Sequence, residues 1–202
     1  MLQVVNTVLY VFGQALWLVP IGALGLFRWA MWLAKRIPAL FYRPIENSFT
    51  CSATIVTPVY NEDPALFRRA LDSWIANAPD RIIAVIDVTD TTCMAIAHTY
   101  PQVTVIPIDI PGKRPALAAG VDAADTAIVV LVDSDVIWEP GVLRKLTMPF
   151  ADPTIGGVGT RQHMYPSDGQ RATLWERLAD IYLDIRYADE VPATTRWGRA
   201  VS

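Results

Sequence analysis

Residues 127–135 read Ala-Ile-Val-Val-Leu-Val-Asp-Ser-Asp, so an uninterrupted apolar run ends directly in two closely spaced carboxylates. A short, β-branched apolar run that ends in turn residues predicts a buried strand, here Ala127–Val132. Further runs of this type predict strands at Ala53–Val59, Arg81–Asp87 and Val103–Ile108. Strands that are apolar throughout are typical of parallel sheets that are covered on both faces.

Segments with a helical spacing of apolar residues lie between these strands. They predict helices at Pro64–Asn77, Thr91–Tyr100, Lys113–Ala124 and Pro140–Phe150. Another strand is expected at Ile155–Tyr165 and a long helix at Arg171–Asp189. This alternation predicts an α/β fold, with a Rossmann-like, mainly parallel sheet and helices on both faces.

Composition excludes several classes of protein. The chain has 202 residues, of which 52% are hydrophobic and 18% charged, so it is too apolar for an intrinsically disordered protein. Its only cysteines, Cys51 and Cys93, have no partners at zinc-site spacing and suit a reducing compartment. The net charge of -3 provides no broad basic surface, and we therefore expect no nucleic acid partner.

The N-terminal segment has the properties of a membrane anchor. No charged side chain occurs before Arg28, and Thr7–Phe27 contains 21 residues. A helix of that length spans about 31 Å, close to the roughly 30 Å hydrocarbon core of a bilayer. The sequence therefore predicts a transmembrane anchor over residues 1–28. The alternatives are a buried core helix and a cleaved signal peptide, but a signal peptide would begin with basic residues.

Basic residues follow the apolar segment and outnumber acidic ones there. The charged residues among the first 50 are Arg28, Lys35, Arg36, Arg43 and Glu46. By the positive-inside tendency, the chain after residue 28 is expected on the cytoplasmic side of a plasma or inner cell membrane. Residues 29–50 would form a juxtamembrane segment, either an interfacial helix on the lipid bilayer or a plain flank of the anchor. The remaining domain is expected at residues 51–202.

The strand ends carry the candidate site, because open parallel sheets bind ligands outside the carboxyl ends of their strands. Asp133 and Asp135 lie two positions apart after the most apolar strand. Together they could bind Mg²⁺ or Mn²⁺, which take carboxylate oxygens and keep open positions for phosphate groups. The alternative is that Asp-Ser-Asp only forms a turn.

The other strand ends add polar groups of several kinds. Lys113 and Arg114 follow Gly112 at a predicted helix start, where cations suggest an anionic partner, although they could be a solvated pair. Asp87 is placed to accept a hydrogen bond from a nucleobase, whereas Asp90 is expected to cap the next helix. Tyr60 and Asn61 follow the first strand and could simply form a loop.

Taken together, these strand ends resemble those of family 2 glycosyltransferases of the GT-A fold. The resemblance rests on Thr57-Pro58-Val59-Tyr60-Asn61-Glu62, Asp87, Gly112-Lys113-Arg114 and Asp133-Ser134-Asp135. The Gly-Lys-Arg element and the apolar N-terminus resemble the hyaluronan, chitin and cellulose synthase branch, hyaluronan synthases most. The resemblance implies an enzyme that transfers a sugar from a UDP-sugar donor to a growing polysaccharide or other glycan acceptor, with inversion and with a divalent metal ion.

The same resemblance implies a role for each matching residue. Asp133 and Asp135 would hold Mg²⁺ or Mn²⁺, with Asp135 the more direct ligand. The residues implied in donor binding are Thr57, Pro58, Tyr60, Asn61, Glu62, Asp87, Lys113, Arg114 and Ser134.

Two features of that branch do not occur in the sequence. They are a later acidic pair that supplies the general base and a Gln-x-x-Arg-Trp motif at the acceptor site. We therefore expect the base beyond Ser202 and a chain that represents the donor-binding part of a longer enzyme. The alternatives are a nucleotide-binding fragment without turnover and a non-enzymatic, membrane-anchored α/β protein.

Overall fold

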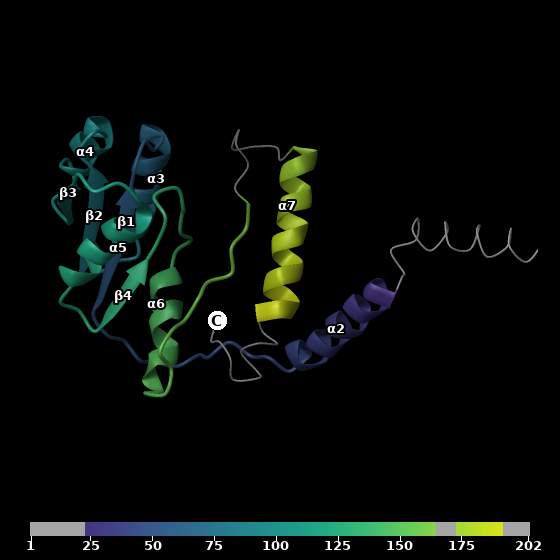
Figure 1. The fold of residues 1–202 in the computed structure, drawn as a ribbon. Coiled ribbons are helices and arrows are strands. Elements are labelled where there is room, and N and C mark those ends of the chain that lie inside the picture. Colours follow the sequence, from purple (N-terminus) through teal and green to yellow (C-terminus); the bar gives the residue numbers. More distant parts are fainter. Residues whose placement is uncertain (1–22, 165–172, 192–202) are drawn as a thin grey trace, which may run out of the picture. The chain divides into compact units, whose positions relative to one another are not determined.

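The structure, a computed structural model, describes residues 23–164 and 173–191 (Figure 1). It divides into two compact units, one formed by Ile45–Gly156 and the other by the segments on either side of it. Most of the predicted anchor, Thr7–Phe27, lies outside the described residues. Within the described ranges, no helix combines the length and the apolarity needed to cross a membrane. The anchor, and the domain boundaries at 28 and 50, stay predictions.

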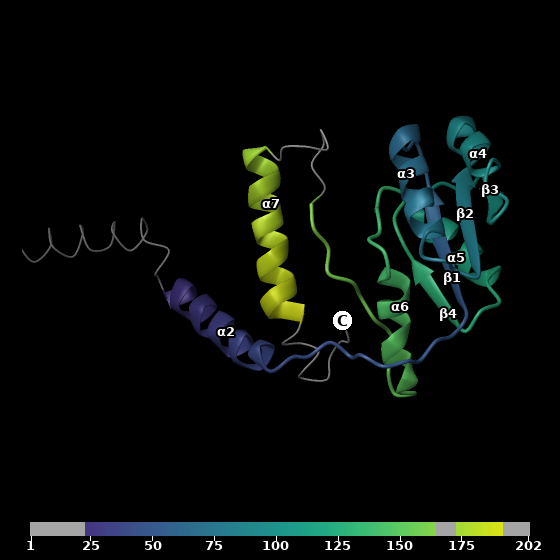
Figure 2. The same ribbon diagram turned by 180° about the vertical axis from the view of Figure 1, so that it is seen from behind.

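The Ile45–Gly156 unit is built on a four-stranded parallel sheet with the order β3-β2-β1-β4 (Figures 1 and 2). Its strands are β1 (Ala53–Val59), β2 (Arg81–Asp87), β3 (Val103–Ile108) and β4 (Ile128–Leu131). β1 is central and pairs with both β2 and β4, so that Val56 lies beside Ile83 on one side and Leu131 on the other. The prediction of a parallel α/β fold is confirmed, and the sheet is consistent with the GT-A fold.

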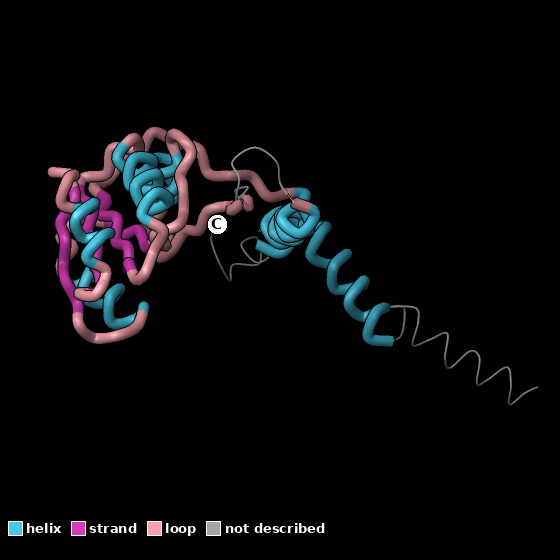
Figure 3. Tube along the Cα trace, turned by 90° about the horizontal axis from the view of Figure 1, so that it is seen from above, coloured by secondary structure: helices cyan, strands magenta, loops and turns pink. Residues whose placement is uncertain are grey.

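Helices lie on both sides of the strands (Figure 3). These are α3 (Pro64–Ile75), α4 (Thr91–Ala97), α5 (Lys113–Asp122), α6 (Val142–Thr147) and the 3₁₀ helix η1 (Met148–Ala151). Side chains alternate between the two faces of a strand, so Val56, Ile83 and Val85 form the face that packs against α5. On the other face, Ile82, Ala84 and Ile86 are completely buried.

Capping residues fix where two of these helices begin. Asp63 accepts a hydrogen bond from the Leu66 amide (2.7 Å) and so caps α3, with Pro64 in the first turn. Asp90 accepts from the Cys93 amide (3.0 Å) and caps α4, as the sequence predicted. Both caps stand at the carboxyl end of the sheet, so both helices start beside the candidate site.

Helix α3 is also bonded to the loop that follows β4. The Trp74 indole is completely buried in α3, and its Nε1 donates to the Val136 carbonyl (2.9 Å). Asn77 donates to the Glu139 carbonyl (3.1 Å) just after α3 ends. These bonds hold the loop after Asp135 against a buried helix.

The other unit contains α2 (Ala23–Leu40), α7 (Leu174–Ile185) and the π-helix η2 (Arg186–Glu190). A reciprocal capping box begins α7, since Thr173 accepts from the Glu176 amide (3.2 Å) and Glu176 accepts from the Thr173 amide (2.6 Å). Helix α7 continues into η2, and together they match the helix predicted at Arg171–Asp189, except that α7 begins at Leu174 and η2 ends one residue later than predicted, at Glu190.

The strand predicted at Ile155–Tyr165 is wrong for the part that the structure describes, Ile155–Met164, which forms no strand. Its polar groups bond to α7 instead of to a neighbouring strand. Arg161 forms an ion pair with Asp184 (2.6 Å), and the Met164 amide donates to Asp180 (3.0 Å). The glycines at 156, 157 and 159 also disfavour a strand, because they lack side chains that pack on a pleated surface.

Gly120 allows α5 to lie close to the sheet, which gives the first testable prediction. A Cβ atom there would overlap Val56 Cγ1 and lie 3.1 Å from Val85 Cγ2. We expect Gly120→Val to lower the free energy of unfolding by about 1–3 kcal/mol through overpacking. The measurement is the denaturant midpoint of the 202-residue chain. Ala118→Val, at an exposed position of the same helix, is the control. Equal losses for both variants would contradict the close approach.

Candidate functional site

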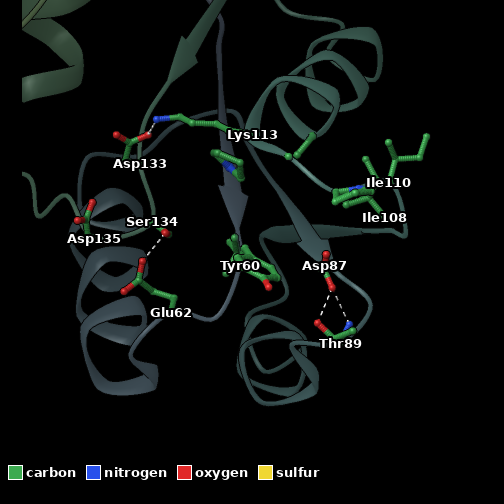
Figure 4. A pocket seen from close by; sticks show the side chains of 15 residues that line it. Tyr60, Glu62, Asp87, Thr89, Ile108, Ile110, Lys113, Asp133, Ser134 and Asp135 are labelled. Carbon is green, nitrogen blue, oxygen red and sulfur yellow. Dashed lines mark hydrogen bonds and ion pairs between the residues drawn. The ribbon is translucent and has the colours of Figure 1, made fainter.

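A pocket of about 600 Å³ opens at the carboxyl end of the sheet (Figure 4). All of its walls belong to the Ile45–Gly156 unit. It is lined by Pro58, Val59, Tyr60, Glu62, Asp87, Thr89, Ile108, Ile110, Pro111, Gly112, Lys113, Ala116, Asp133, Ser134 and Asp135. The loops after all four strands contribute to it, as expected for a parallel sheet.

The pocket has two chemically different sides. In Figure 4, Asp87, Ile108 and Ile110 lie on one side of Tyr60. The carboxylates of Asp133 and Asp135 lie on the other side. The strand order explains this, because β2 and β3 end on one side of central β1 and β4 ends on the other. The Tyr60 side chain is 72% exposed, so its ring surface is open to a ligand.

The Asp87 carboxylate is held in its charged form. Its Oδ1 accepts from both the Thr89 hydroxyl (2.6 Å) and the Thr89 amide (2.9 Å). These two hydrogen bonds, the hydroxyl first, lower the pKa of Asp87 below its usual value. Asp87 therefore acts as an acceptor on the apolar side of the pocket at neutral pH.

The start of α5 brings a cation to the other side. Gly112 has φ 118°, a conformation that favours glycine, and it places Lys113 at the first position of the helix. Lys113 Nζ forms an ion pair with Asp133 Oδ1 (2.5 Å). Gly112 makes no side-chain cap, so the first amides of α5 have no capping side chain and suit an anion.

Asp133 and Asp135 fit a divalent cation that is shared with a ligand. Both carboxylates are exposed at the pocket, whereas Ser134 between them is buried. No cluster of three or more His, Cys, Asp or Glu side chains suited to a metal occurs in the described residues. Mg²⁺ commonly uses one or two carboxylates and completes its shell with water and substrate phosphates. The residues therefore suit a metal ion that binds together with a phosphorylated ligand.

The Ser134 hydroxyl points towards the Glu62 carboxylate (Figure 4). It donates to Glu62 Oε2 (2.6 Å). Both residues line the pocket, but their polar side-chain atoms bind each other. The bond joins the loop after β1 to the loop after β4.

Most of the predicted site residues lie together in the pocket. The ones that line it are Pro58, Tyr60, Glu62, Asp87, Lys113, Asp133, Ser134 and Asp135. Thr57 does not; it is completely buried in β1, and its hydroxyl has no hydrogen-bond partner in the described part of the chain. Asn61 and Arg114 are exposed and do not line the pocket. Asn61 has φ 49°, which marks it as a turn residue.

Sequence reasoning missed part of the wall. Thr89, which binds the Asp87 carboxylate, was not singled out, although a Thr two residues after an Asp is a common local turn pattern. The apolar residues Ile108, Ile110 and Pro111 were also missed. The available signal was their position, because Ile108 ends the predicted strand Val103–Ile108 and Ile110 and Pro111 follow it, where the other strand-end residues were expected to meet.

Comparison with known sequences identifies the class of protein that this fold and pocket represent. The profile of the family described as "Glycosyltransferase like family 2" matches residues 52–202. The chain therefore belongs to glycosyltransferase family 2, as the strand-end motifs indicated.

Curated relatives support the same family. A type 2 glycosyltransferase of Gibberella zeae is 30% identical over 149 residues, which cover 71% of this chain and 28% of that protein. One of Pyricularia oryzae is 27% identical over 85% of this chain and 36% of that protein. An N-acetylglucosaminyltransferase of Rhizobium leguminosarum is 26% identical over 77% of this chain and 38% of that protein. The alignments thus span only 28–38% of these relatives.

The Thr89 hydroxyl gives a prediction about pH. Thr89→Val removes the stronger of two hydrogen bonds to the Asp87 carboxylate, so the pKa of Asp87 should rise towards its usual value. The measurement is a carboxyl ¹³C NMR titration. Since the folded pKa is lowered, Asp87 stabilises the wild-type fold above the usual Asp pKa, and this stabilisation is lost as pH falls through the folded pKa. Thr92→Val is the control, and an unchanged titration in Thr89→Val would refute the assignment.

Proposed function

We propose that this chain is the donor-binding part of a membrane-associated, metal-dependent, inverting glycosyltransferase. The donor is a UDP-sugar and the acceptor is a growing polysaccharide or another glycan. The observation that carries the proposal is the two-sided pocket at the strand ends, in a chain of glycosyltransferase family 2. Its strand-end motifs resemble those of the branch that makes hyaluronan, chitin or cellulose, and we propose that it acts in this way.

The apolar side of the pocket suits a uracil base and its ribose. Ile108, Ile110 and the exposed Tyr60 ring offer surfaces for a planar ring. The Asp87 carboxylate would accept a hydrogen bond from the base, because Thr89 keeps it charged. A carboxylate acceptor favours a base with an N–H donor.

The other side suits a diphosphate. Lys113 and the first amides of α5 would neutralise phosphate oxygens. Asp133 and Asp135 would hold Mg²⁺ or Mn²⁺, which supplies charge neutralisation for a departing diphosphate when bound. The Lys113–Asp133 ion pair is about half exposed, and exposed pairs contribute only about 0–1 kcal/mol. Lys113 can therefore turn from Asp133 to a phosphate at little cost.

Metal-dependent UDP binding is the test of this proposal. We expect wild-type chain to bind UDP more tightly with Mn²⁺, and Asp135→Ala to reduce UDP affinity to its Mn²⁺-free level, a loss of about tenfold or more. Isothermal titration calorimetry with and without Mn²⁺ measures both. The control is Asp122→Ala, at the far end of α5 from the pocket. Folded wild type that binds no UDP would refute the proposal and favour a non-enzymatic α/β protein.

A nucleotide-binding fragment without turnover is the second candidate. Within the described residues, each carboxylate of the pocket already has another proposed role than that of a general base. Asp87 and Glu62 accept hydrogen bonds from Thr89 and Ser134. Asp133 and Asp135 would bind the metal ion. Incorporation of labelled sugar into glycan distinguishes an active glycosyltransferase from a fragment that only binds the nucleotide. UDP binding without incorporation would limit the function of these 202 residues to donor binding.

We also propose that α2 lies along the cytoplasmic headgroups of a plasma or inner membrane. Leu26, Trp29, Leu33, Ile37 and Leu40 share one side of the helix at helical spacing, and each is more than half exposed. Arg28 and Lys35 fall on the opposite side by the same spacing, whereas Arg36 falls at the edge of the stripe beside Trp29 and the exposed Phe27 falls outside the stripe. An exposed apolar stripe with basic residues opposite is typical of an interfacial helix.

Spin labels on the two sides of α2 test this placement. In vesicles of mixed zwitterionic and anionic phospholipid, a label at Leu33→Cys should be relaxed several-fold more by oxygen, which partitions into the acyl region. A label at Arg28→Cys, which is exposed like Leu33 but lies on the opposite side, should be relaxed more by an aqueous nickel complex. Cys51→Ser and Cys93→Ala remove the native thiols. The two labels are matched controls, since a helix in solvent would give both the same aqueous exposure.

A further inference from the structure

Every polar atom of Glu62 is bonded within the protein. Its Oε2 accepts from the Ser134 hydroxyl (2.6 Å), and its Oε1 accepts from the Asp63 amide (3.0 Å). Its amide donates to Asp90 Oδ2 (3.3 Å), and its carbonyl accepts from Cys93 Sγ (3.7 Å). Both carboxylate oxygens of Glu62 are therefore turned to protein donors, although the residue lines the pocket.

These bonds connect three loops at the carboxyl end of the sheet. Glu62 lies between β1 and α3, Asp90 between β2 and α4, and Ser134 after β4. Asp90 is itself fixed, because its other oxygen caps α4. Burial, followed by the nearby Asp90 carboxylate, raises the pKa of the Cys93 thiol to about 12. The thiol thus stays protonated and remains a donor to Glu62.

The residue that bonds to Glu62 lies between the two carboxylates of the proposed metal position. Ser134 is 7% exposed, whereas Asp133 and Asp135 on either side are exposed at the pocket. The Val136 amide donates to the Asp133 carbonyl (3.2 Å), which closes a turn across Ser134. Asp133 is the first residue of this turn and Ser134 and Asp135 are its two central residues, so holding the Ser134 side chain inward restricts the backbone that carries both carboxylates. The hydrogen bond from the Ser134 hydroxyl to Glu62 keeps the Ser134 side chain in that inward position.

We propose that Glu62 is a positioning residue that acts through Ser134 to hold Asp133 and Asp135 in the geometry that a divalent cation needs. This inference rests on the proposed function, since it concerns the same metal position. The resemblance implied that Glu62 and Ser134 contact the UDP-sugar directly. The inference instead gives them the role of holding the Asp133 and Asp135 carboxylates in place. Groups that orient metal-binding side chains commonly change metal affinity 10- to 100-fold when they are removed.

The experiment is a double-mutant cycle read out by UDP affinity with and without Mn²⁺. We expect Glu62→Met and Ser134→Ala each to weaken Mn²⁺-dependent UDP binding roughly tenfold. The double variant should lose about tenfold as well, because both changes remove one interaction. UDP binding without Mn²⁺ should stay as in wild type. Mn²⁺ affinity measured by electron paramagnetic resonance, at a fixed UDP concentration, should fall in parallel.

Glu62→Gln is the conservative variant. Its amide oxygen can accept from the Asp63 amide, and its NH₂ group can donate to the Ser134 oxygen. It should therefore keep Mn²⁺-dependent binding within about twofold of wild type, whereas a metal ligand or a required charge would not be replaced by an amide.

Three outcomes would overturn the inference. Losses that multiply to about a hundredfold in the double variant would mean that the two residues act independently. A loss of Mn²⁺-free UDP binding in Glu62→Met would mean direct contact with the nucleotide. Unchanged binding in Ser134→Ala would exclude the route through Ser134, even if Glu62→Met does not fold. Wild-type chain without Mn²⁺-dependent binding would instead refute the proposed function, on which the inference rests.

Discussion

The close packing of α5 on β1 and β2 is the constraint on which the site depends. Gly120 brings the helix near Val56 and Val85, and the helix axis then carries Lys113 to the carboxyl end of the sheet. The Gly112 conformation completes this geometry, because it turns the chain from the loop after β3 into the first turn of α5. Helix α5 thus covers one face of the sheet and also places the Lys113 cation in the wall of the pocket.

Burial on both faces of the sheet explains where the charges lie. β1 and β2 are almost completely buried, and a charged side chain in their interior would carry a large desolvation cost. Carboxylates are therefore restricted to the strand ends, where water and hydrogen-bond donors reach them. Thr89 donates a hydrogen bond to the Asp87 carboxylate, and Lys113 forms an ion pair with Asp133. The apolar character of the strands thus restricts acidic groups to both ends of the sheet, with Asp80 and Asp125 before strands and Asp87, Asp133 and Asp135 at the pocket.

Much of this fold could be predicted from the sequence, because local pattern and burial agree in β1, β2 and β3, whose predicted bounds match the structure. β4 is shorter than predicted, since it pairs only with β1 among the described strands. The strand predicted after Ile155 failed for a non-local reason. Its Arg161 and Met164 bond to acidic residues of α7, which apolar periodicity in a short window does not reveal.

The site was predictable to a similar extent and for a similar reason. Residues directly after strands, such as Asp87 and Asp133, converge wherever parallel strands do, so their place in the pocket follows from topology. Thr57 belongs to the same motif, yet its side chain is buried, because it lies inside β1, where consecutive residues on both faces are covered.

Glu62 shows what topology alone omits. Whether a carboxylate faces a ligand or a neighbouring loop depends on donors from other parts of the chain, here Ser134, which is 72 residues away. When the motif after the first strand is considered alone, it predicts that Glu62 contacts the ligand. The three-loop hydrogen-bond network assigns it to the protein, where it can hold two exposed and mutually repelling carboxylates at a fixed separation.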